Sequence, residues 1–216
     1  MILEENQERW KLSGKNIVVT GGTKGIGSAI VEECCKLGGK VLTCARNESE
    51  LNNRIDEWSK KGFQVRGVIL DLSSPEQRNV LVEAARSYFD GKVHALVNNV
   101  GTNIRNKATS YTEEEYKKIM DTNLNSCFFI SQSFYELLRE TRNASIINIS
   151  SVAGGNNIAI RSGVIYAMTK AALSQMSYNL ACEWAKDNIR VNAVSPWYIN
   201  TPLAAPVSEV CLSTRS

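Results

Sequence analysis

A tyrosine and a lysine stand four positions apart in the segment Tyr166-Ala167-Met168-Thr169-Lys170. In a helix, this spacing puts both side chains on one face. A tyrosine hydroxyl ordinarily ionises near pH ~10, so it needs help to exchange a proton at neutral pH. A lysine ammonium one turn away would stabilise the phenolate and so lower the pKa of Tyr166. Because such pairs also arise by chance, a surface cation–π contact is the alternative interpretation.

A second hydroxyl group stands where it could serve the same reaction. Ser151 follows an apolar run, 144–150, that has the composition of a strand. At the carboxyl edge of a parallel sheet, where such folds bind ligands, the Ser151 hydroxyl could donate to a carbonyl oxygen and hold it beside the tyrosine. The three side chains together indicate proton transfer to or from an oxygen of a small molecule.

A glycine-rich turn, Gly21-x-x-x-Gly25-x-Gly27, stands between an apolar run and a segment of helical spacing. This context is typical of dinucleotide binding. Gly21 permits the tight turn, Gly25 lets the backbone approach a pyrophosphate, and Gly27 allows close packing of helix on strand. The helix N-terminus offers N–H groups and a positive dipole end to the phosphates. A plain glycine-rich loop is the alternative. The expected cofactor contacts in this turn are Gly21, Thr23, Lys24, Gly25, Ile26 and Gly27.

The identity of the dinucleotide depends on a position about 20 residues beyond the glycines, where NAD sites carry an acid for the ribose 2′-hydroxyl. This chain has Arg46 there. A guanidinium can pair with a 2′-phosphate, and Lys24 would add a second cation at the same place. A solvated surface arginine is the alternative. The two cations predict NADPH over NADH.

These residues need a scaffold, and the chain predicts one by alternation. Short β-branched runs at 16–20, 40–45, 64–70, 93–98, 144–150 and 190–194 alternate with helical patterns at 24–37, 48–61, 76–89, 113–139 and 165–187. Such alternation predicts an α/β fold with a parallel sheet. We expect a doubly wound, Rossmann-like sheet with strand order 3-2-1-4-5-6. The helix starts agree, since Asn47 is placed to cap one helix and Pro75 to begin another.

Composition narrows the function classes. The chain has 216 residues, 25 Lys plus Arg against 22 Asp plus Glu, and a net charge of +3. Length predicts one domain over 1–216, with a polar lead-in over 1–13. The mild charge gives no reason to expect a nucleic acid partner. No export signal or span is visible, so a cytoplasmic protein is expected, without membrane contact. With one histidine, His94, and no Cys-x-x-Cys spacing among its six cysteines, neither a metal site nor a Ser-His-Asp triad is expected.

Five motifs in order resemble the short-chain dehydrogenase/reductase family: the glycine turn, Asn98-Asn99-Val100-Gly101, Asn123, Ser151, and Tyr166-x-x-x-Lys170. The lead-in Arg9–Lys15, Cys44-Ala45-Arg46 and Pro196–Thr201 are similar to the plant tropinone reductase-like branch. The resemblance covers approximately residues 8–205. It implies an NADP-dependent oxidoreductase that reduces a small-molecule ketone to a secondary alcohol.

The resemblance also implies roles for individual residues. Tyr166 would be the general acid of carbonyl reduction, Lys170 would lower its pKa and bond the nicotinamide ribose, and Ser151 would orient the carbonyl. Asn123 would hold a water that relays protons to Lys170. The remaining contacts with the cofactor would come from Asp71 and Leu72 at the adenine, Asn98 and Gly101 along the adenine ribose, and Ile199 and Thr201 at the nicotinamide amide.

The chain departs from the family pattern in two places. Ser151 and Tyr166 stand 15 positions apart, about two more than is usual, and the surplus falls at Gly154–Asn157 in a loop beside the substrate. The family's last strand is expected to be missing, and 207–216 to be an irregular tail. A homo-oligomer of the family's kind would be weakened by that loss. The alternative to an active reductase is therefore a truncated isoform, cofactor-binding but catalytically weak, that acts as a partner subunit. A misfolding-prone product is the third reading.

Overall fold

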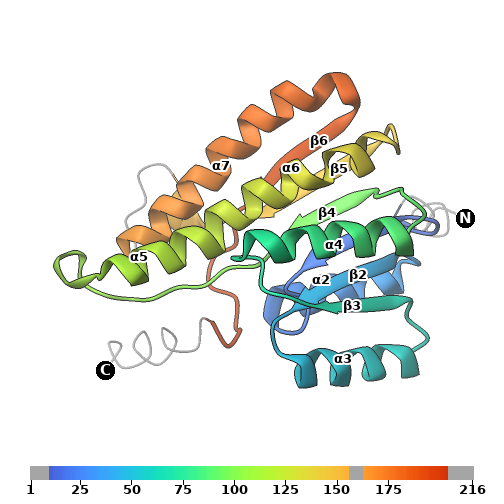
Figure 1. Cartoon of the computed structure of the whole chain (residues 1–216), viewed down its shortest axis with the longest axis horizontal. Helices are drawn as coiled ribbons and strands as arrows, with labels where there is room; N and C mark the ends of the chain where they lie inside the picture. Colours follow the sequence, from blue (N-terminus) through green and yellow to red (C-terminus); the bar gives the residue numbers. More distant parts are fainter. Residues whose placement is uncertain (1–9, 156–162, 204–216) are drawn as a thin grey trace, which may run out of the picture.

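The computed structural model describes residues 10–155 and 163–203. Its centre is a parallel sheet of six strands in the order β3-β2-β1-β4-β5-β6, so the predicted fold class and strand order are confirmed (Figure 1). The strands are β1 (Asn16–Thr20), β2 (Lys40–Ala45), β3 (Val65–Ile69), β4 (Ala95–Asn98), β5 (Ala144–Ile149) and β6 (Ile189–Val194). The expected surplus at Asn156 and Asn157, and the tail 207–216, lie outside the described residues.

Helices cover both faces of this sheet, as a doubly wound fold requires. On one face, α2 (Gly25–Lys36) and α3 (Glu48–Lys60) bury Val31 and Trp58 against β1 and β2. On the other face, α4 (Pro75–Tyr88), α6 (Ser126–Arg139) and α7 (Val164–Trp184) form the larger core, in which Phe134 and Leu96 are fully buried. The alternation of apolar strands with amphipathic helices therefore gives two cores, one on each side of the sheet.

The predicted helix starts are confirmed. The Asn47 side chain accepts from Glu50 N at the start of α3, and Pro75 is the first residue of α4. The Glu50 carboxylate pairs with Lys24 of the glycine-rich turn at 2.6 Å. The start of α3 is thereby linked to the glycine turn.

The helix predicted over 113–139 differs from the expectation. It consists of α5 (Glu113–Met120), a π turn over Asp121–Asn125, and α6. Figure 1 shows these parts as one long rod beside α7, and both α5 and the π turn contact α7. A π turn inserts an extra residue into the helical repeat, so the side chains before and after Asn123 point in directions that a regular helix would not give them.

A buried polar network lies where β4, β5, α6 and α7 meet. Asn148 Oδ1 accepts from Asn98 Nδ2 at 2.9 Å and from Cys127 Sγ at 3.3 Å, and Asn148 Nδ2 donates to Ser177 Oγ at 2.9 Å. Asn98 Nδ2 also donates to Ser131 Oγ at 2.9 Å. Asn148 is fully buried, so this network satisfies polar groups that water does not reach.

The only histidine and two side chains of the lead-in lie near the amino ends of the strands. His94 Nδ1 accepts from Asn16 N at 3.0 Å just before β4, and Leu12 packs on the core, but Trp10 is exposed.

Of the cysteines, Cys35, Cys44 and Cys127 are buried and Cys34 is half-buried, while Cys182 is exposed. Among the described residues, no helix has the length and apolar composition to cross a membrane.

The network around Asn148 predicts a large effect on stability. Asn148→Leu removes the acceptor of one Asn98 N–H and of the Cys127 thiol and the donor to the Ser177 hydroxyl, so we expect the free energy of unfolding to fall by about 2–4 kcal/mol. Urea unfolding measures this change. Asn192→Leu, an exposed change on β6, is the matched control and should stay within about 0.5 kcal/mol of the wild type. An equal loss in both variants would show that the network does not stabilise the sheet.

Candidate active site

The glycine-rich turn after β1 is folded tightly against the sheet. Gly21 and Gly25 have φ angles of +69° and +52°, a region that favours glycine. Gly22 N donates to the Thr43 hydroxyl at 3.0 Å, and that hydroxyl donates to the carbonyl of Val19 at 2.7 Å. Thr43 of β2 therefore fixes the turn. The sequence analysis missed this residue, because nothing distinguishes it from other strand threonines.

Gly27 lies behind this turn and serves packing. A Cβ on Gly27 would stand 2.2 Å from the Gly21 carbonyl oxygen and 2.4 Å from Asn99 Nδ2, so no larger residue fits, as predicted. Helix α2 begins at Gly25, and the Lys24 side chain does not cap it. The first N–H groups of α2 are therefore available to an anion.

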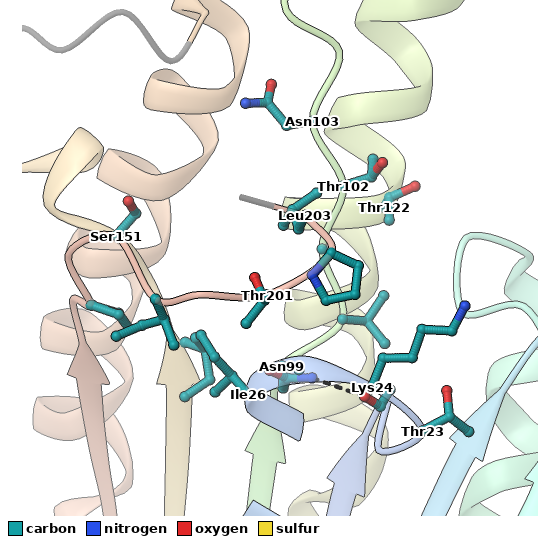
Figure 2. Close-up of a pocket in the computed structure, with 18 of the residues that line it drawn as sticks. Thr23, Lys24, Ile26, Asn99, Thr102, Asn103, Thr122, Ser151, Thr201 and Leu203 are labelled. Atoms are coloured by element: carbon teal, nitrogen blue, oxygen red, sulfur yellow. Dashed lines mark hydrogen bonds between the residues drawn. The ribbon is translucent and has the colours of Figure 1, made fainter. Parts of the chain in front are cut away.

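A cavity of about 760 Å³ lies over the carboxyl ends of the strands, beside the glycine turn. In Figure 2, Thr23 and Lys24 lie at one end, Asn103 and Ser151 lie toward the other, and Thr201 lies between them. Most of the predicted cofactor contacts line this cavity: Gly21, Thr23, Lys24, Gly25, Ile26, Arg46, Asp71, Leu72, Gly101, Tyr166, Lys170, Ile199 and Thr201.

The two cations that predict NADPH both line the cavity, and each has a carboxylate partner. Lys24 Nζ lies 2.6 Å from Glu50, and Arg46 lies 3.7 Å from Asp71. Burial acts to raise the pKa of Asp71, but hydrogen bonds from Ser73 and the charge of Arg46 hold it below its ordinary value. Within residues 10–155 and 163–203, His, Cys, Asp and Glu side chains form no cluster of three that could hold a metal.

The turn after β3 carries Asp71 and Leu72, which line the cavity. Two side chains from the start of α4 hold this turn. Gln77 Oε1 accepts from Asp71 N at 2.6 Å, and Arg78 Nε donates to the Leu72 carbonyl at 2.8 Å. Arg78 is only 6% exposed, so its guanidinium donates this bond from inside the protein. Sequence reasoning missed Gln77 and Arg78, although their place in the first turns of a helix after Asp71-Leu72 is a usable signal.

Asn98 does not lie where the resemblance places it. Its side chain belongs to the buried network with Ser131 and Asn148, and it does not line the cavity. The expectation of a cofactor contact from this side chain is therefore wrong, because Asn98 points into the core at the end of β4. Its neighbour Asn99 lines the cavity, and its Nδ2 donates to the carbonyl oxygens of Thr20 and Gly21.

Lys170 is the most constrained charged group of the site. It is 4% exposed, and its Nζ donates to the carbonyl of Ile149, at the end of β5, at 2.7 Å. Burial lowers the pKa of Lys170 to about 8. The same Nζ lies 5.6 Å from the ring centroid of Tyr166, so the expected placement of the pair on one face of a helix is confirmed.

Ser151 lies beside Tyr166, two residues after the end of β5. The Ser151 hydroxyl donates to the Tyr166 phenol oxygen and accepts from Ala153 N at 3.1 Å. The short turn over Val152–Gly154 packs so closely on α7 that a Cβ on Gly154 would stand 2.3 Å from the Lys170 carbonyl carbon. Gly154 therefore allows Ser151 to approach Tyr166, a requirement that sequence reasoning missed.

The pKa of Tyr166 moves in the direction opposite to the expected one. Burial raises it above its ordinary value, while the Ser151 hydrogen bond and the charge of Arg105 act to lower it. The net lowering expected from Lys170 is therefore not what this structure gives, because burial of the phenol outweighs the groups that act to lower its pKa.

Asn123, at the centre of the π turn, is fully buried and does not line the cavity. Its Oδ1 accepts from Thr102 N at 2.7 Å, and its Nδ2 donates to the Thr102 carbonyl at 2.9 Å and to Thr169 Oγ1 at 3.2 Å. The side chain thus joins the segment after β4 to α7. These bonds position its neighbours, and the water-holding role of Asn123 stays a prediction.

The burial of Lys170 has a consequence for stability. An unfolded lysine keeps its proton up to about pH 10.5, whereas the folded Lys170 loses it from about pH 8. Between these values the unfolded state binds more protons, so stability rises with pH. Relative to Lys170→Met, the wild type should gain about 2–3 kcal/mol of unfolding free energy from pH 8 to pH 10.

Urea unfolding across this pH range measures that gain. Lys186→Met removes an exposed lysine just after α7 and controls for the loss of one charge. A constant difference between wild type and Lys170→Met would mean that Lys170 is not desolvated.

Comparisons with known proteins agree with this geometry. A short chain dehydrogenase family profile matches residues 15–211. A tropinone reductase homolog of Arabidopsis thaliana is 51% identical over 205 residues, which cover 95% of this chain and 77% of the relative. A tropinone reductase homolog of Datura stramonium is 47% identical over 202 residues, which cover 94% of this chain and 75% of the relative.

Solved structures give the same result. The L-sorbose reductase of Gluconobacter frateurii, complexed with NADPH and L-sorbose, superposes with a TM-score of 0.84 at 32% identity and covers 89% of this chain and 73% of its own. Actinorhodin polyketide ketoreductase with NADPH has a TM-score of 0.84 at 30% identity, over 91% and 75%. The chain belongs to the short chain dehydrogenase family, in the branch of the tropinone reductase homologs, and is an oxidoreductase that binds a nicotinamide cofactor.

Proposed function

We propose that the protein is an NADPH-dependent reductase that converts a small-molecule ketone to a secondary alcohol. The observation that carries this proposal is the Ser151–Tyr166 hydrogen bond, set in a cavity whose other end is the glycine turn. The relatives are named as reductase homologs, and two structural neighbours are ketone reductases with NADPH. A shared name does not transfer a substrate, so tropinone itself is not part of the proposal.

The residues of the cavity fit a nicotinamide dinucleotide. Gly25 has a φ of +52°, and a Cβ there would stand 3.1 Å from Thr201 Cγ2, so a glycine is favoured at this point of the cavity wall. Arg46 and Lys24 would hold the 2′-phosphate, and Asp71 the adenine. Gly101 would line the path of the adenine ribose, and the nicotinamide end would lie by Ile199, Thr201, Tyr166 and Lys170. When bound, the cofactor supplies the hydride.

Tyr166 and Ser151 would have different roles at the substrate carbonyl. The Tyr166 hydroxyl would donate its proton to the carbonyl oxygen as the alcohol forms. The Ser151 hydroxyl would donate a hydrogen bond to the same oxygen and stabilise its developing negative charge. Because the phenol must then carry a negative charge, the Lys170 ammonium 5.6 Å from the ring centroid favours that step. With a pKa of about 8, Lys170 is charged at neutral pH.

Removing the phenol hydroxyl tests this mechanism. We expect Tyr166→Phe to lower kcat by about 10²–10⁴-fold, the usual contribution of a positioned acid, with NADPH affinity unchanged. Tyr178→Phe is the matched control, because Tyr178 is 67% exposed on the same helix. NADPH oxidation is followed over a panel of ketones. Equal turnover in wild type and Tyr166→Phe would contradict the assignment, and NADPH binding without turnover of any ketone would favour the partner-subunit alternative.

The cofactor preference has a separate test. Arg46→Asp should weaken NADPH binding by about one to two decades, the worth of a charge-assisted contact, and NADH binding far less. Calorimetry with both cofactors measures the ratio. Arg86→Asp is the control, since Arg86 is also an exposed arginine paired with a carboxylate, Glu83. An unchanged NADPH to NADH ratio in Arg46→Asp would show that Arg46 does not contact the 2′-phosphate.

A further inference from the structure

We propose that Arg105 forms a subsite for a carboxylate of the substrate, so that the ketone reduced at Tyr166 is a keto acid. The inference rests on the proposed reductase function and names the substrate class that this site selects. Arg105 lines the same cavity as Ser151 and Tyr166. It lies in the segment that follows β4, two residues after Asn103, which Figure 2 shows on the far side of the cavity from Thr23 and Lys24.

The backbone around Arg105 is fixed by one side chain. The Tyr111 hydroxyl donates to the Ile104 carbonyl at 2.8 Å and accepts from Asn106 N at 3.2 Å. It therefore bridges the residues on either side of Arg105. Two hydrogen bonds to one rigid aromatic side chain hold this part of the loop in place, so the arginine is presented from an ordered backbone.

The same clamp places Arg105 relative to the catalytic helix. Gly163, at the start of α7, lies so close to Tyr111 that a Cβ on Gly163 would stand 2.5 Å from the Tyr111 hydroxyl oxygen. Tyr166 follows in the first turn of that helix. The charge of Arg105 is felt at the Tyr166 phenol, whose pKa it acts to lower. Arg105 thus lies within electrostatic reach of the atom that would donate the proton.

Charge is distributed unevenly along the cavity. At the Lys24 end, two carboxylates neutralise two cations, Glu50 with Lys24 and Asp71 with Arg46. At the Tyr166 end, the charged lining residues among those described are Lys170 and Arg105, and no lining carboxylate accompanies them. Lys170 Nζ is buried and bonded to a carbonyl. Over residues 10–155 and 163–203, Arg105 has no ion pair.

The exposed Arg105 guanidinium, without a neighbouring carboxylate in the described part of the chain, would favour substrates that carry a negative charge. A carboxylate on the substrate would form charge-assisted and bidentate hydrogen bonds with it. A substrate ammonium would be repelled by both Arg105 and Lys170. The hydrocarbon part of the ketone would contact the apolar side of the cavity at this end, which includes Val152, Trp197 and Leu203. The site thus suits a compact apolar ketone that carries one carboxylate.

Three matched ketones test the inference: a cyclohexanone with a carboxylate, its methyl ester, and a cyclohexanone with a dimethylamino group. For the wild type we expect kcat/KM to be about tenfold or more higher for the carboxylate than for the ester, mostly through KM. Arg105→Gln should remove this preference, and Arg105→Glu should shift it to the dimethylamino ketone. Lys107→Glu, an exposed cation on the same loop that does not line the cavity, should keep the wild-type preference.

A binding measurement separates this inference from the proposed function. Cyclohexanecarboxylate cannot be reduced, and calorimetry on the NADPH-loaded protein should show about tenfold weaker binding to Arg105→Gln than to wild type or Lys107→Gln. Reduction of the ester as efficiently as the carboxylate, or equal cyclohexanecarboxylate affinity in wild type and Arg105→Gln, overturns the carboxylate subsite alone. Failure to reduce any of the three ketones overturns the reductase proposal and the subsite with it.

Discussion

The site depends on one buried ammonium group. Lys170 Nζ donates to the Ile149 carbonyl, and the Lys170 backbone carbonyl accepts from the Ser150 hydroxyl at 2.8 Å. These two bonds join α7 to the end of β5 at the level of Ser151. A buried charge without such partners would cost several kcal/mol, so the strand end and the helix must meet in this arrangement. The positions of Tyr166 and Ser151 follow from that meeting.

Two asparagines extend this constraint across the sheet in different ways. Asn148, within β5, ties the strand to β4, α6 and α7 through groups that water does not reach. Asn123 ties the loop after β4 to α7, and it can do so because the π turn aims its side chain away from the regular helical direction. Polar hydrogen bonds therefore fix the carboxyl ends of β4 and β5 relative to α7, whereas apolar packing stabilises the two cores.

Much of this arrangement could be predicted from the sequence. Strand positions and order follow from apolar runs that alternate with helical patterns, and Asn47 and Pro75 mark helix starts by local chemistry. The π turn could not be predicted, because a one-residue insertion in the repeat leaves the apolar pattern of 113–139 nearly unchanged. Thr43 was missed for another reason: its bond to the glycine turn depends on the tertiary approach of β2 to β1. Asn98 was misplaced since neighbouring strand residues face opposite sides.

Ion pairs at the cofactor end decide how easily an anion can enter. The Lys24–Glu50 and Arg46–Asp71 pairs have exposed cations, with 57% and 70% of the side-chain surface accessible. Exposed pairs contribute about 0–1 kcal/mol each, whereas a charge-assisted contact with phosphate is worth about 1.5–3 kcal/mol. Exchange of a carboxylate for a phosphate would therefore be favourable, and it would leave Asp71 free for the adenine contact that we propose. The pairs keep both cations near the cavity without blocking it, because water already surrounds them.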